Sequence, residues 1–202
     1  MIIAALASLA CSRSDSAIKG PETATDSVVA TVPAQRDSAV DSLKTCGVTG
    51  TPMLTEQGLG ELRQGRSVSE ISALCEVLSD SPQRGVEGMM ERVLVVRIAG
   101  EPVRSIVTND RIFRIEINTP RFRTADSLGV DTPLRRIASM RGAQFAPGED
   151  GVYGFSGDHC GLSFRFSLPW RPPAGGQWTA RAITEEHGDA AVNRVIVIEC
   201  RR

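Results

Sequence analysis

The chain has 202 residues, which is enough for one domain of ordinary size or two small ones. Its 23 Lys and Arg are offset by 24 Asp and Glu, giving a formal net charge of −1 at pH 7. This balance argues against a nucleic-acid-binding protein, because such proteins usually carry a large positive excess.

The first ten residues, MIIAALASLA, carry no charge and lead directly into Cys11. A bilayer span needs about 20 apolar residues, whereas a run of this length is typical of a signal-peptide core. The segment resembles a bacterial lipoprotein signal, in which Leu, a small residue and Gly or Ala precede a lipidated Cys. Ala10 and Cys11 match that pattern, while Ser8 and Leu9 stand in reverse order. The alternative is a secretory signal that happens to contain a cysteine.

The lipoprotein resemblance implies that residues 1–10 are removed and that Cys11 carries acyl (palmitate) chains. A diacyl or triacyl anchor supplies the two chains that stable membrane attachment requires. Ser12, rather than Asp, follows the cysteine. By the sorting rule of such lipoproteins, this implies an outer-membrane lipoprotein of the bacterial cell envelope, facing the periplasm or the surface.

Residues 11–44 are rich in Ser, Asp, Thr, Ala and Pro and contain no aromatic residue. Such a stretch buries too little apolar surface to offset its conformational entropy. We expect a disordered, lipid-anchored linker here, followed by a folded domain over residues 45–202.

Within that domain, two segments 66 residues apart resemble each other, since Leu62, Val68 and Ile71 match Leu128, Leu134 and Ile137. Ser67 and Glu70 form an S-x-x-E capping box, and Thr132 is the equivalent expected N-cap. Three strand-like segments follow each expected helix, with Asn109-Asp110 as a tight turn. These strands are expected at residues 92–100, 102–108, 111–117, 151–155, 162–168 and 193–199. The pattern predicts an α+β fold of two tandem helix-plus-three-stranded antiparallel sheet modules, about 45–117 and 118–202, forming one domain.

Four cysteines follow the anchor, and an even number after a secretion signal predicts two disulfides. If the strands at 162–168 and 193–199 pair antiparallel, Cys160 lies beside Cys200. Cys46 and Cys75 are then left to pair with each other. The alternative, a zinc site of four cysteines, lacks the ligand pairs two to four residues apart that structural zinc sites usually show.

The phrases LRQGRSVSEI and FRTADSLGVDTPLRRIA, each followed by strand-like segments, are similar to the tandem modules of β-lactamase-inhibitor-like proteins. They are also similar to small outer-membrane lipoproteins of the BamE (SmpA/OmlA) type. Ser127 and Asp131 replace glycines of the phrase that recurs in such modules. The resemblance implies a protein that binds other proteins or scaffolds envelope assemblies, and it transfers no functional residue to this chain.

The segment SLPWRPPAGGQWTARAITEEHGD reads as a long break between two strands, and such loops are often functional. Because aromatic and Arg side chains are favoured interface anchors, our candidate binding residues are Trp170, Arg171, Trp178 and Arg181. The alternative is that one or both tryptophans cap the sheet core. The sequence leaves open whether a basic cluster binds an anion; its members are Arg121, Arg123, Arg135, Arg136 and Arg141.

Metal-binding and catalytic patterns are weak. His159 and Cys160 are adjacent and would point to opposite faces of an extended chain, and the EEHGD segment around His187 is typical of a solvated loop. GFSGD lacks the strand-to-helix context and spacing of a nucleophile elbow. We therefore expect no metal, no cofactor and no catalytic activity.

The sequence predicts an envelope lipoprotein that acts as a non-catalytic protein-binding or scaffolding module. Its partner would be another envelope protein or a cell-wall component, and its lipid anchor would be its sole contact with the membrane. The alternative function is inhibition of a periplasmic or extracellular hydrolase.

Overall fold

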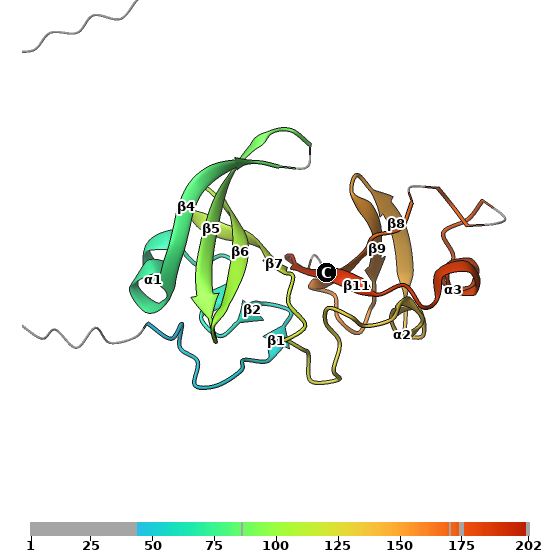
Figure 1. Cartoon of the computed structure of the whole chain (residues 1–202), viewed down its shortest axis with the longest axis horizontal. Coiled ribbons are helices and arrows are strands. Elements are labelled where there is room, and N and C mark those ends of the chain that lie inside the picture. Colours follow the sequence, from blue (N-terminus) through green and yellow to red (C-terminus); the bar gives the residue numbers. More distant parts are fainter. Residues whose placement is uncertain (1–43, 86, 170, 174–175, 201–202) are drawn as a thin grey trace, which may run out of the picture. The chain divides into compact units, whose positions relative to one another are not determined.

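The computed structural model describes residues 44–85, 87–169, 171–173 and 176–200 (Figure 1). The expected signal peptide, the lipidation of Cys11 and the linker up to residue 43 lie outside the described residues, as does Trp170.

An eight-stranded antiparallel sheet forms the frame of the domain, in the order β4-β5-β6-β7-β11-β10-β9-β8. The first four strands are successive hairpins, and β11 returns from the end of the chain to lie between β7 and β10. The two halves of the chain therefore share one sheet, joined at the β7–β11 pair, which we call the seam. The strands are β4 (Glu76–Arg84), β5 (Met90–Ile98), β6 (Glu101–Thr108), β7 (Arg111–Ile117), β8 (Gln144–Gly148), β9 (Gly151–Phe155), β10 (Leu162–Phe166) and β11 (Val192–Val197).

The predicted fold class is wrong, because the chain is mostly β and is not a tandem of helix-plus-three-stranded modules. Each half contributes four strands, and the strand missed in each half, β4 or β8, is an edge strand. β4 contains Pro82 and β8 contains Pro147, and few of their side chains are buried. Edge strands tolerate proline and lack a regular apolar alternation, so neither produced a strand signal.

Three short helices and a small second sheet accompany the large one. The helices are α1 (Val68–Leu74), α2 (Leu134–Ala138) and α3 (Ala180–His187), and none in the described part of the chain is long and apolar enough to cross a bilayer. The small sheet consists of β1 (Leu54–Thr55), β2 (Gly58–Leu59) and β3 (Leu62–Arg63).

The capping box expected at the first helix is present. The Ser67 hydroxyl accepts a hydrogen bond from the Glu70 amide, and the Glu70 carboxylate accepts one from the Ser67 amide. Thr132 does not cap α2; its hydroxyl accepts from the Gly129 amide, and Pro133 occupies the N-cap. The two segments of the 66-residue repeat nevertheless make equivalent contacts with the large sheet. Ser67 forms a β-bridge with Arg111 at the start of β7, and Pro133 forms one with Ala191, next to β11.

One face of the large sheet is covered and apolar. Its side chains, such as Leu94 and Phe164, lie in one core cluster with Leu59 of the small sheet, Ile71 of α1 and Ile137 of α2. In Figure 1, β1, β2 and α2 lie below the sheet, and the ends of the β4–β5 and β8–β9 hairpins rise on the other side. We call the side that faces the core cluster the covered face.

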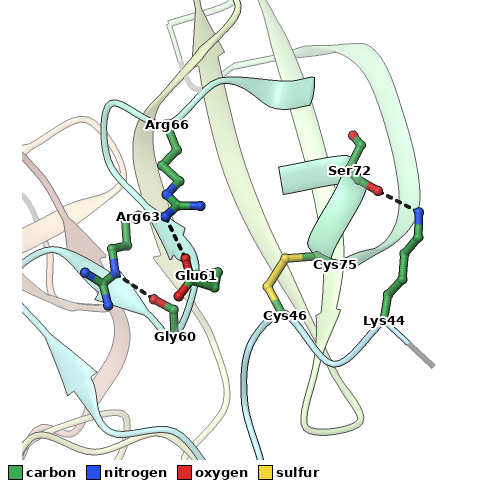
Figure 2. The surroundings of a disulfide bond; sticks show 8 residues. All are labelled: Lys44, Cys46, Gly60, Glu61, Arg63, Arg66, Ser72 and Cys75. Atoms are coloured by element: carbon green, nitrogen blue, oxygen red, sulfur yellow. Dashed lines mark hydrogen bonds and ion pairs between the residues drawn. A yellow bond between two sulfur atoms is a disulfide. The ribbon is translucent and has the colours of Figure 1, made fainter. Parts of the chain in front are cut away.

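Both predicted disulfides are present, Cys46–Cys75 and Cys160–Cys200. β10 and β11 pair antiparallel with Leu162 opposite Val197, which brings Cys160 to Cys200 as the strand pattern predicts. Figure 2 shows that Cys46–Cys75 ties the start of the domain to the end of α1, where Lys44 donates a 2.7 Å hydrogen bond to the Ser72 carbonyl. This disulfide therefore holds the segment that leads into the small sheet next to the start of β4.

Candidate functional site

The other face of the large sheet, which we call the open face, carries one residue from each of the eight strands in a continuous register. Unlike the covered face, this row mixes charged, polar and apolar side chains, and it crosses the seam without a break. The row consists of Ser79, Val95, Arg104, Glu116, Ile196, Ser163, Phe155 and Gln144.

Glu116 lies at the seam and is 3% exposed. Arg104, its neighbour in the row, places Nη1 2.6 Å from Oε2, and Arg114, two residues earlier on β7, places Nη2 3.1 Å from Oε1. Arg194 of β11 approaches Oε2 at 3.9 Å. A carboxylate removed from water needs such partners, so three guanidinium groups from three strands hold the Glu116 charge in place.

A second carboxylate extends this network across the C-terminal half. Asp150, in the β8–β9 hairpin, lies 2.8 Å from Arg165 Nε and 3.6 Å from Arg194 Nη1, and it accepts a hydrogen bond from the Tyr153 hydroxyl. Arg194 therefore links the carboxylates of Glu116 and Asp150. The charged network spans β5 to β9, because Glu91 of β5 also pairs with Arg114 at 3.3 Å.

The surroundings of Asp150 and Tyr153 shift the pKa of each side chain. Burial raises the pKa of Asp150, but the hydrogen bonds from Tyr153 and Arg165 and the charges of Arg165 and Arg194 outweigh burial and hold the pKa below its usual value. Burial and the hydrogen bond to Asp150 together raise the pKa of Tyr153 to about 12. Both shifts favour an ionised Asp150 and a neutral Tyr153 around neutral pH.

A cleft of about 420 Å³ lies above this network. Glu87 and Met89 from the end of the β4–β5 hairpin form one wall, and Gly148 and Glu149 from the β8–β9 hairpin form the other. The floor includes Glu116, Arg194, Tyr153 and Ile196, so it lies across the seam. The cleft is thus a product of joining the two halves, since each half supplies one wall.

Buried apolar residues lie beneath the charged groups of the floor. Val93, Ile106 and Ile196 project from the open face and yet are at most 7% exposed. Ile106 is the direct cross-strand neighbour of Arg114. The long aliphatic stems of arginines cover apolar neighbours while their charged ends remain in the polar layer, which accounts for this burial.

Three of the four candidate binding residues chosen from sequence, Arg171, Trp178 and Arg181, lie within the described part of the chain, before α3 and on it. Trp178 is half-buried and packs against the core, as the alternative interpretation had it. Arg181 is exposed on α3 and pairs with Glu185 at 2.8 Å, and Arg171 is exposed in the preceding segment. The expected long loop also contains α3, whose N-cap Thr179 follows Trp178 directly.

Four of the five arginines of the expected basic cluster have separate partners. Arg121 approaches Glu101 at 3.9 Å, Arg141 pairs with Asp158 at 2.8 Å, and Arg135 pairs with Asp189. Arg123 donates to the Pro120 and Ser127 carbonyls, and Arg136 is exposed on α2.

His159, weighed at the sequence level as a metal ligand, contacts Asp126 with 3.1 Å between Nε2 and Oδ2. This contact joins the β9–β10 connection to the segment before α2. Within the described ranges, no group of three or more His, Cys, Asp or Glu side chains is placed to hold a metal ion.

None of the residues of the charged network was predicted from the sequence as a site residue. The available signal was the presence of charges at the alternate positions of otherwise apolar strands, as in RIFRIEI and NRVIV. Such charges usually mark a solvated sheet face, and only the strand register shows that these converge on one carboxylate.

Comparisons with known proteins are limited to the fold. No protein-family model matches the chain, and no curated protein matches it. The crystal structure of an uncharacterized Escherichia coli protein, yfeY, is similar to this structure with a TM-score of 0.54 and 18% sequence identity. The similarity covers 73% of this chain and 99% of that chain.

Proposed function

We propose that this protein is a non-catalytic, protein-binding lipoprotein of the bacterial envelope and that the cleft on the open face receives a segment of its partner. The cleft itself is the observation that carries the proposal. It is a hollow with a wall from each of two hairpins and a floor whose carboxylates are held by ion pairs, and its lining is formed by sheet and hairpin residues.

The polarity of the cleft favours a polypeptide over a small apolar ligand. Small-molecule pockets are lined mostly by hydrophobic and aromatic side chains, whereas five carboxylates and two guanidinium groups line this one. Met89, which is 64% exposed on one wall, adds an apolar contact of the adaptable kind found at protein-binding surfaces. Polar and apolar groups at one site suit a protein segment, which carries both.

The fixed ion pairs support a binding role over a catalytic one. Glu116 contacts three arginines, and Asp150 contacts Tyr153, Arg165 and Arg194. An acid–base catalyst needs a pKa near the working pH, and Asp150 and Tyr153 are shifted away from it in opposite directions.

Site-specific photo-crosslinking in cells tests this function. A photoreactive residue in place of Met89 on the wall of the cleft should yield discrete adducts with one or a few envelope proteins. The matched control places the same residue at Arg136, which is exposed on α2. Equal adducts from both positions, or none from position 89, would contradict a binding role for the cleft. An adduct with a hydrolase whose activity the purified protein abolishes would favour the inhibitor alternative.

The membrane anchor is a separate part of the proposal and needs its own measurement. Intact mass of the protein extracted from membranes should show a chain that starts at Cys11 with a lipid-sized increase. A Cys11→Ala variant should lose the lipid and leave the membrane fraction. An unlipidated chain that retains Met1 would refute the lipoprotein assignment and leave the cleft unaffected.

A further inference from the structure

We infer that the segment accepted by the cleft is basic, with a Lys or Arg side chain lying between the two hairpin walls. This inference rests on the proposed function, because it specifies the partner of the same cleft. It is carried by the distribution of charge over the walls and the floor.

The charges of the floor compensate one another. Glu91, Glu116 and Asp150 each contact at least one arginine within 4 Å. Arg104 and Arg165 supply additional positive charge from the same network, so the floor does not present a large surplus of either sign.

The walls are different, because their charges have one sign. Glu87 stands on the β4–β5 side and Glu149 on the β8–β9 side, and both are exposed. Among the described residues, neither makes a salt bridge. Two uncompensated carboxylates therefore flank the mouth from opposite sides, and a cation placed between them would interact with both.

Apolar groups lie where the stem of such a side chain would pass. Met89 is on the wall next to Glu87, and Tyr153 and Ile196 are in the floor. Lys and Arg bury their methylene stems against apolar surface while the charged end contacts acids. The combination disfavours an acidic segment, which would meet like charge at both walls.

The test uses the full-length protein labelled with ¹⁵N and three short synthetic peptides capped at both ends. One alternates Lys with Ala, the second has Glu in place of Lys, and the third has Ser. The Lys peptide should shift amide resonances of cleft residues such as Glu149 and Ile196, and its affinity should fall steeply between about 0.15 and 1 M salt. The Glu and Ser peptides should bind at least about tenfold more weakly.

A double variant, Glu87→Gln with Glu149→Gln, should weaken Lys-peptide binding about tenfold. Both residues are exposed, and the spectrum itself reports whether the fold is kept. Glu199→Gln is the matched control, because Glu199 is an exposed acid outside this cleft, and it should bind like the unmodified protein. Equal binding of the Glu or Ser peptide, or undiminished binding of the Lys peptide to the double variant, overturns the inference.

These results separate the inference from the proposed function. If crosslinks at position 89 persist while the double variant binds the Lys peptide undiminished, the cleft binds protein but does not select for positive charge. If the Lys peptide binds as expected while position 89 gives no envelope adduct, the charge preference holds and the proposed function fails.

Discussion

The two faces of the large sheet are stabilised in different ways. The covered face buries an apolar cluster under helices and a small second sheet, and residues such as Leu94, Phe164 and Ile137 are fully buried there. The open face also contains buried residues, but Glu116 is among them and arginines form the layer above. One sheet can therefore hold a generic apolar core on one side and a specific charged surface on the other.

The difference matters because the two kinds of burial respond differently to change. Apolar burial is non-directional and scales with the area removed from water. A buried carboxylate depends on particular charged partners. If one partner is lost, the desolvation penalty of the remaining charge is no longer compensated. The covered face should therefore govern overall stability, and the open face should govern the geometry of the cleft.

The largest effect is expected from the covered face. Phe164→Ala on β10 removes a fully buried ring from the core and should lower the free energy of unfolding by about 3–5 kcal/mol. The matched variant is Phe155→Ala on the neighbouring strand β9, a half-buried ring on the open face, which should cost about 1–2 kcal/mol. Chemical denaturation followed by circular dichroism measures both. Equal losses would mean that the open face is packed like a second core.

The disulfide at the start of the domain should have the next largest effect. Cys46 and Cys75 are 29 residues apart, and loop-closure entropy for that length corresponds to about 3–4 kcal/mol. The double variant Cys46→Ala with Cys75→Ala should lose stability of that order, since the bridge holds a covering segment to the sheet. The pair Cys160 and Cys200, 40 residues apart, provides the comparison and should cost a similar amount. A loss well below 1 kcal/mol in the first pair would show that packing alone keeps that segment in place.

Glu116→Gln tests the open face directly. The substitution keeps the shape of the side chain but leaves Arg104, Arg114 and Arg194 without their shared negative charge. The side chains of these arginines are 25%, 28% and 26% exposed and keep part of their hydration. We therefore expect the free energy of unfolding to fall by about 2 kcal/mol, less than the loss of about 3–5 kcal/mol typical of a broken, fully buried pair.

The control for Glu116 is Glu76→Gln, which removes an exposed acid paired with Arg97 on the edge strand. Exposed pairs contribute about 0–1 kcal/mol, so this variant should change the free energy of unfolding little. The loss in Glu116→Gln should also persist at about 1 M salt, because buried pairs are screened much less than exposed ones. Similar values for the two variants would remove the distinction drawn between the open face and the sheet edge.

Local features that follow from neighbouring residues could be predicted from the sequence. The capping box of Ser67 and Glu70 is one, and the left-handed Asn109-Asp110 turn between β6 and β7 is another. The pairing of Cys160 with Cys200 also followed, because two strongly apolar strands fixed its register.

Features that depend on contacts between residues far apart in the sequence could not be predicted. The edge strand β4 contains Pro82 and no buried residue, and its sequence lacks the apolar alternation that marks a strand. The seam pairs Glu116 with Ile196, residues 80 positions apart, and neither strand carries a signal for that choice of neighbour. The cleft requires both the seam and the two hairpins, so it could not be derived from either half.

The smallest effect is expected from the hydrogen bond between Tyr153 and Asp150. Tyr153→Phe removes the donor and should cost about 1 kcal/mol at neutral pH. Because the pKa of Asp150 is lowered in the folded protein, its contribution to stability is present above the ordinary value of 3.8 and is lost as pH falls below it. Since the variant removes one cause of that lowering, its unfolding free energy should fall less steeply than that of the unmodified protein in acid.

Alkaline titration gives the opposite sign for Tyr153. Its pKa rises from 10.0 to about 12 on folding, so its contribution is fully present below pH 10 and is lost as pH rises through about 12. Tyr153→Phe has no such group, and the stability difference between the two proteins should therefore shrink across that window. An unchanged difference from neutral pH to about pH 12 would mean that neither burial nor the hydrogen bond to Asp150 stabilises the neutral Tyr153 hydroxyl, and that this part of the cleft floor is not fixed as described.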